Sequence, residues 1–112
     1  MSEASQLRVK RLQEFLAKDP NDSFSRYAIG LELYKSGEIK EAISYFEELI
    51  KRDPDYVGTY YQLGKIFVSA GKAEKAEKIF RDGIAISSKS GNTHAKSELM
   101  TALNELLNED GF

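Results

Sequence analysis

Apolar residues recur at helical spacing along almost the whole chain. Two stripes of them lie between residues 23 and 36, where we predict a helix, and a second helix is predicted over residues 39–52. Gly37 lies between the two, at the position where a left-handed residue commonly ends a helix. The pattern predicts a helical hairpin whose second helix has one apolar stripe, formed by Ile39, Ala42, Ile43, Phe46, Leu49 and Ile50.

The same hairpin recurs 34 positions further along the chain. Glycine stands inside the first helix of both copies, where it costs about 1 kcal/mol relative to alanine, so its recurrence indicates a close helix contact. We expect the paired alanines to face these glycines, and the paired phenylalanines four positions later to fill the wider gap one turn away. Six identical pairs share the offset: Tyr27 and Tyr61, Gly30 and Gly64, Gly37 and Gly71, Ala42 and Ala76, Phe46 and Phe80, and Ile50 and Ile84.

These positions resemble the tetratricopeptide repeat, a helical hairpin with a period of about 34 residues. The resemblance covers about residues 23–88 and implies an all-α fold, a right-handed α-α superhelix of helical hairpins with about six helices. Arg26 takes the position of the large aromatic residue that Tyr60 supplies in the second repeat, so we expect Arg26 to be less buried. The other matched positions are Ile29, Gly30, Leu33, Gly37, Ala42, Phe46 and Pro54, and then Leu63, Gly64, Phe67, Gly71, Ala76 and Phe80.

The length of 112 residues fits a single domain, and small stand-alone bacterial tetratricopeptide proteins are similar in layout. We expect a loop over residues 89–92. In the N-terminal helix Arg8 takes the small-residue position, where we expect no preceding helix to pack. The apolar residues of this helix are Val9, Leu12, Phe15 and Leu16. The expected segments are an N-terminal lid helix over 4–19, repeats over 23–54 and 57–88, and a C-terminal capping helix over 92–108.

Composition and charge narrow the class of partner. The chain has 16 basic and 18 acidic residues, a net charge of −2, so no strong field attracts nucleic acid or an anionic membrane. No stretch approaches the roughly 20 apolar residues of a membrane span, and the N-terminus lacks a secretory signal. We therefore expect a cytoplasmic protein without nucleic-acid or membrane partners.

No set of residues points to catalysis, a cofactor or a metal. The chain has no cysteine and one histidine, His94, for which a surface position is expected. Gly64-Lys65 and Gly71-Lys72 lack the other residues of a phosphate-binding loop. The sequence therefore predicts a protein that is not an enzyme.

The resemblance implies a binding surface, because the first helices of tetratricopeptide repeats line the concave side of the stack. A peptide or helix with hydrophobic anchors fits such an aromatic surface. Lysine and asparagine of a chaperone-type carboxylate clamp are replaced here by Tyr27, Leu31 and Tyr61, so no such clamp is expected. The residues expected on the concave face are Phe24, Tyr27, Leu31, Tyr34, Tyr61, Lys65 and Val68.

Two alternatives stay open at the level of the sequence. The tyrosines could pack against one another, or the terminal helix could cover them. The chain could instead be a structural module that acts through homo-oligomerisation, for example as a homodimer, or as a subunit of a larger complex.

Overall fold

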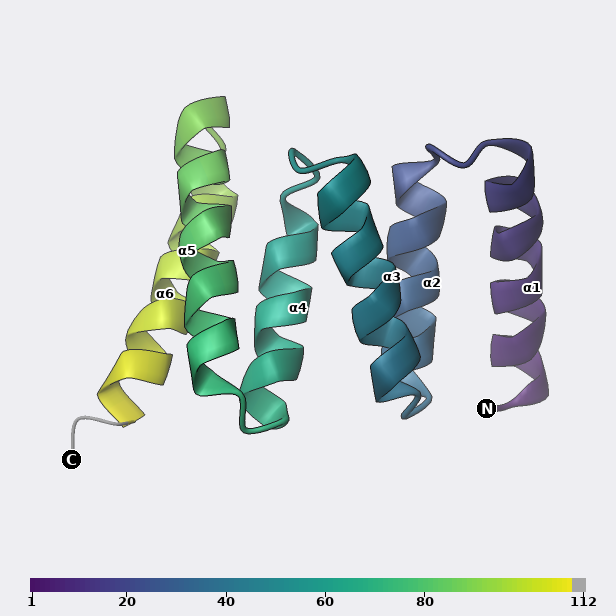
Figure 1. Cartoon of the computed structure of the whole chain (residues 1–112), viewed down its shortest axis with the longest axis horizontal. Coiled ribbons are helices and arrows are strands. Elements are labelled where there is room, and N and C mark those ends of the chain that lie inside the picture. The colour runs from purple at the N-terminus through teal and green to yellow at the C-terminus, as the bar shows by residue number, and fades with distance from the viewer. Residues whose placement is uncertain (110–112) are drawn as a thin grey trace. The chain divides into compact units, whose positions relative to one another are not determined.

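A computed structural model describes residues 1–109, which form six α-helices and no strand (Figure 1). This confirms the predicted all-α class. The helices are α1 (Glu3–Lys18), α2 (Ser23–Lys35), α3 (Ile39–Arg52), α4 (Gly58–Ser69), α5 (Ala73–Ser90) and α6 (Thr93–Glu109).

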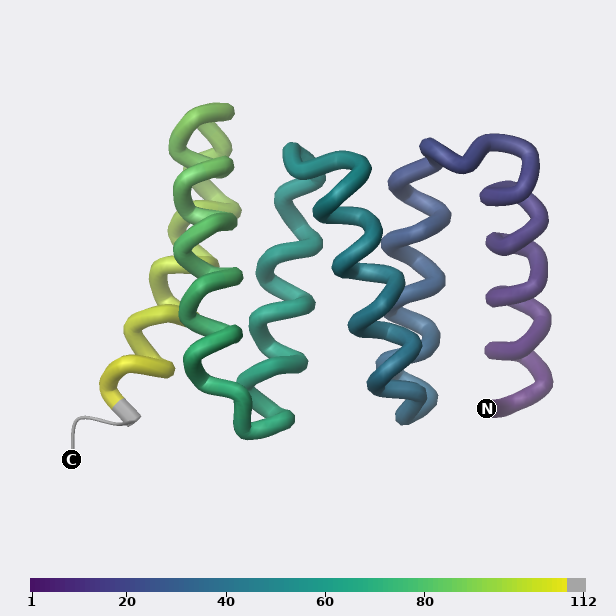
Figure 2. The backbone as a smooth tube through the Cα atoms, in the orientation of Figure 1, coloured from purple at the N-terminus to yellow at the C-terminus, as the bar shows by residue number. Residues whose placement is uncertain are grey.

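The helices form two compact units. The first, Met1–Tyr56, contains α1, α2 and α3, and α2 packs against both of its neighbours. The second unit begins at Val57 and contains α4, α5 and α6, in which α6 packs on α5 and also contacts α4. Within each unit consecutive helices run in opposite directions (Figure 2).

Each unit contains one hairpin seam in which a phenylalanine ring lies on a helical glycine. A Cβ added to Gly30 would stand 2.7 Å from two ring atoms of Phe46, and one added to Gly64 would meet the ring of Phe80. The rings therefore occupy the space over the glycines themselves, and the expectation that they fill a gap one turn away was wrong. A flat ring needs the room that the missing side chain leaves, and both rings are almost completely buried.

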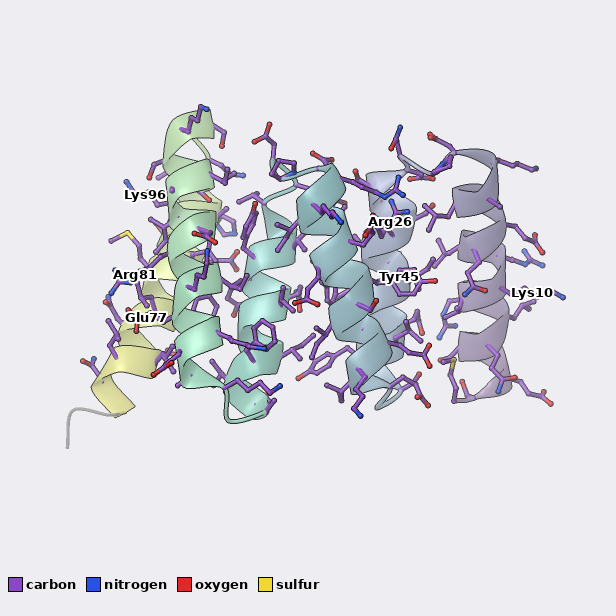
Figure 3. The ribbon with its side chains drawn as sticks, in the orientation of Figure 1. Lys10, Arg26, Tyr45, Glu77, Arg81 and Lys96 are labelled. Atoms are coloured by element: carbon purple, nitrogen blue, oxygen red, sulfur yellow. The ribbon has the colours of Figure 1, made fainter. Side chains whose placement is uncertain are left out.

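Arg26 is buried nearly as fully as the aromatic residue that it replaces. The exposed fraction of Arg26 is 6%, against 3% for Tyr60. Arg26 is therefore less buried than the aromatic residue, as expected, but only by a small margin. Arg26 lies near the start of α2 (Figure 3). Its guanidinium donates a hydrogen bond to the carbonyl oxygen of Pro20 at 2.7 Å, which compensates for its burial. Arg26 thus joins the α1–α2 loop to the helix that follows.

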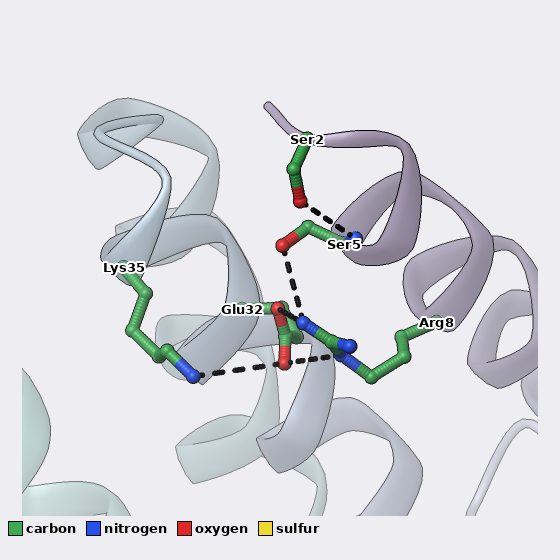
Figure 4. A network of polar contacts seen from close by, with 5 residues as sticks. All are labelled: Ser2, Ser5, Arg8, Glu32 and Lys35. Atoms are coloured by element: carbon green, nitrogen blue, oxygen red, sulfur yellow. Dashed lines mark hydrogen bonds and ion pairs between the residues drawn. The ribbon is translucent and has the colours of Figure 1, made fainter.

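Helix α1 is attached to α2 by an ion pair. The Arg8 guanidinium donates from Nε to the Glu32 carboxylate at 2.8 Å, and Lys35 lies 4.0 Å from the same carboxylate (Figure 4). The hydrogen bond from Arg8 holds the pKa of Glu32 below its usual value. Arg8 therefore contacts the helix that follows α1, a partner that the sequence did not predict.

The predicted apolar stripe of α1 is only partly buried. Val9 is buried, but Phe15 is 55% exposed, although it aligns with Leu49 of α3, which is completely buried. The contact between α1 and α2 is less extensive than the contact between α3 and α2, so less of the apolar stripe of α1 is covered. Phe15 therefore belongs to the surface of the first unit.

Helix α5 continues further than expected. Lys89 and Ser90, which we expected in a loop, are helical, because no proline stops α5 and Gly91 ends it with a left-handed φ of 74°. The expected left-handed residue after α2 is confirmed, since φ of Gly37 is 83°. Within residues 1–109, no helix combines the length and the apolar character that a membrane crossing requires.

Asp22 caps α2 and gives the first unit a pH-dependent contact. Its carboxylate accepts hydrogen bonds from the hydroxyl of Ser25 at 2.6 Å and from the backbone N–H of Ser25 at 3.0 Å. These two bonds, the hydroxyl first, hold the pKa of Asp22 below its usual value. A carboxylate whose pKa is lowered by folding stabilises the fold above its unfolded pKa, and the contribution disappears as the pH falls through the folded pKa.

We therefore expect Asp22→Ala to lower the free energy of unfolding by about 1 kcal/mol near neutral pH. The difference from wild type should shrink as the pH is lowered towards about 2, because the wild-type carboxyl is then protonated. Urea unfolding of both proteins across this pH range measures it. Asp22→Asn keeps a capping oxygen without the charge, so its difference from Asp22→Ala should not depend on pH.

Candidate partner-binding surface

The first unit presents four of the expected surface residues on α2. Phe24, Tyr27, Leu31 and Tyr34 are spaced so that they share one side of the helix. Phe24 is 66% exposed, and the other three are half-buried. An apolar side chain as exposed as Phe24 is available for contact with a partner.

Tyr27 also contributes to packing within its unit. Its ring lies edge-on to Phe46 at 5.9 Å between centroids, and its centroid is 5.3 Å from that of Tyr56. Burial raises the pKa of the Tyr56 hydroxyl, and nearby Tyr27 contributes to this shift. Tyr27 therefore packs partly against a tyrosine that lies outside the set of expected surface residues.

The second unit presents the other three residues on α4. Lys65 and Val68 are exposed and Tyr61 is half-buried. The Lys65 ammonium lies over the Tyr61 ring, 5.2 Å from its centroid, which is within the range of a cation–π interaction. Although α6 contacts α4, it leaves all three side chains at least partly accessible.

A pocket of about 310 Å³ lies between α4 and α6 in the second unit. The sequence predicts a binding surface that includes Tyr61, but it predicts only a capping role for α6. The missed signal is that Leu99 and Leu103 of α6 are spaced like Leu63 and Phe67 of α4, 36 positions earlier (99 − 63). The lining residues are Tyr61, His94, Ser97, Glu98, Thr101, Ala102 and Glu105.

Among residues 1–109, no three His, Cys, Asp or Glu side chains lie close enough together to hold a metal ion. His94 is 88% exposed, as expected for a surface residue, and its Nε2 lies 3.7 Å from Oε1 of Glu98. The seven expected surface residues are aromatic or apolar apart from Lys65, whereas the pocket lining also includes hydroxyl groups, His94 and two glutamates.

Comparison with known proteins gives the family. Residues 33–97 match the family model described as tetratricopeptide repeat. The solved structure of a tetratricopeptide repeat domain protein from Salinibacter ruber is 36% identical. It covers 83% of this chain and 94% of its own, with a TM-score of 0.77. No curated protein sequence matches this chain.

Two more distant structures share the fold. The TPR2B domain of yeast Sti1, solved in complex with pHsp70, is 18% identical, with a TM-score of 0.82 over 90% of this chain and 81% of its own. PcrH, solved in complex with the chaperone binding region of PopD, is 14% identical, with a TM-score of 0.83 over 91% of this chain and 77% of its own. The matched segment exceeds half of the sequence and the Salinibacter ruber protein is similar along most of its length, so this chain belongs to the tetratricopeptide repeat family.

Proposed function

We propose that this chain is a non-catalytic scaffold that binds a peptide or helix of a partner protein in the concave groove of tetratricopeptide repeats. The observation that carries the proposal is the exposed apolar surface of the first helix of each hairpin, above all Phe24 on α2, which is 66% exposed. In unit two, Val68 on α4 is 36% exposed. The proposed contact residues are Phe24, Tyr27, Leu31, Tyr34, Tyr61, Lys65 and Val68.

The chemistry of these residues suits a short segment with hydrophobic anchors. Tyrosine rings bury apolar area while their hydroxyl groups stay available for hydrogen bonds to a peptide backbone. Such surfaces hold amphipathic helices or extended peptides through a few anchor side chains. Structures with the same fold hold partner segments: the TPR2B domain of yeast Sti1 was solved with pHsp70 and PcrH with a region of PopD.

The test uses peptides selected from a random display library on the wild-type chain. Phe24→Ala and Tyr61→Ala should each weaken binding of a selected peptide by about tenfold, as expected for aromatic anchor residues. Calorimetric titration measures the dissociation constants. Tyr27→Ala is less suitable, because the loss of its contact with Phe46 also destabilises the unit.

Phe15→Ala is the matched control, since Phe15 is exposed on α1 to a similar degree but lies outside the proposed surface. Its dissociation constant should equal that of wild type. If the selected peptides bind both test variants as tightly as the wild-type chain, the proposed surface is wrong.

Self-association is a second candidate function, and the exposed apolar residues of α1 favour it. Leu7 is 52% exposed and Phe15 is 55% exposed. Sedimentation over a range of protein concentrations tests this candidate, and a sedimentation coefficient that does not change with concentration would exclude it.

A further inference from the structure

We infer that the pocket between α4 and α6 binds a lysine or arginine side chain of the partner peptide. The inference rests on the proposed function and adds the chemistry of one anchor residue. The volume of about 310 Å³ lies at the lower end of the range for ligand sites, so the pocket fits one side chain rather than a helix.

The charge of the pocket is complementary to a cation. Glu98 and Glu105 line it, seven positions apart on one side of α6, and none of the lining residues is lysine or arginine. Glu105 forms no ion pair with any residue in the described part of the chain, 1–109. An incoming ammonium or guanidinium group would therefore meet the carboxylate of Glu105, which has no ion-pair partner within 1–109, and that of Glu98, which lies 3.7 Å from His94.

The aromatic wall of the pocket is already in contact with a cation. The Lys65 ammonium lies 5.2 Å from the centroid of the Tyr61 ring, so this ring already makes a cation–π contact within the chain. Tyr61 and Ala102 also offer apolar contact to the methylene stem of a long basic side chain. The pocket thus combines a surface for the stem with carboxylates for the charged end.

An acidic anchor is the competing prediction, because Lys65 could attract it. A basic and an acidic side chain in the pocket predict opposite changes in peptide affinity for the same substitutions of this chain. If a basic side chain is bound, removal of the carboxylates weakens binding and removal of Lys65 strengthens it, because a like charge is removed. If an acidic side chain is bound, both effects reverse.

The experiment uses display-selected peptides, first in their selected form and then with each basic residue replaced by glutamine. We expect Glu98→Gln/Glu105→Gln to weaken binding by about tenfold and Lys65→Gln to strengthen it by about threefold. Replacement of one particular lysine or arginine of the peptide should abolish the difference between the wild-type chain and the double variant. This loss of difference identifies the residue that occupies the pocket.

Glu41→Gln/Glu47→Gln is the matched control, because it changes the net charge equally at exposed positions of α3. It should leave the dissociation constant unchanged. Selected peptides that bind the wild-type chain and the Glu98→Gln/Glu105→Gln variant equally would overturn the pocket assignment and leave the proposed function standing. A library that yields no binding peptide would overturn the proposed function, and the pocket assignment with it.

Discussion

Phe46→Ala is expected to lower the free energy of unfolding by about 3–5 kcal/mol, the usual cost of removing a buried phenylalanine ring. The ring is completely buried on Gly30 and in edge contact with Tyr27. Its removal leaves a cavity that glycine cannot fill, since no side chain exists there to move inward. Urea unfolding followed by circular dichroism measures the loss.

Phe15→Ala is the matched control for this substitution. It removes the same atoms from a ring that is 55% exposed, so it should cost less than about 1 kcal/mol. Equal losses for the two substitutions would mean that Phe15 is a core residue, as its alignment with Leu49 predicted, and that α1 packs differently.

Gly64→Val is expected to destabilise the second unit by about 3 kcal/mol, through overpacking of the seam. Helix propensity acts in the opposite direction, because valine is a better helix former than glycine. The loss of stability in Gly64→Val therefore reports the clash between the valine side chain and the ring of Phe80. The same substitution in a Phe80→Ala background should cost far less, since the ring is absent.

Ala85→Val is the control for Gly64→Val. Ala85 is an exposed residue of α5, so valine there should cost only about 0.5 kcal/mol of helix propensity. A Gly64→Val protein as stable as wild type would show that α4 and α5 are not in close contact at this position.

The hairpins could be predicted because their glycines, alanines and phenylalanines recur at a fixed offset. Periodicity gives the helix faces, and Gly30 and Gly64 indicate close approach. Periodicity does not give the side-chain directions, so the position of the Phe46 ring directly over Gly30 was not foreseen. The partner of Arg8 was not predictable either, because its ion pair with Glu32 joins residues 24 positions apart.

The inward side of α6 could be predicted from the sequence, but the side of α6 that lines the pocket could not. The predicted capping role agrees with the burial of three leucines of α6, Leu99, Leu103 and Leu106. The polar side of α6 had no counterpart in the repeats, since Ser97 and Thr101 replace the residues that correspond to Tyr61 and Lys65. Only the packing of α6 beside α4 shows that Glu98 and Glu105 share a pocket with Tyr61.

The central claim is that a partner segment binds on the first helices of the two hairpins. It is tested most directly by adding a selected peptide to the isotope-labelled chain and recording which side-chain and amide NMR signals shift. We expect the largest shifts at Phe24, Leu31, Tyr61 and Val68, with small shifts along the exposed sides of α3 and α5. Shifts confined to α3 and α5, with α2 and α4 unchanged, would contradict the claim.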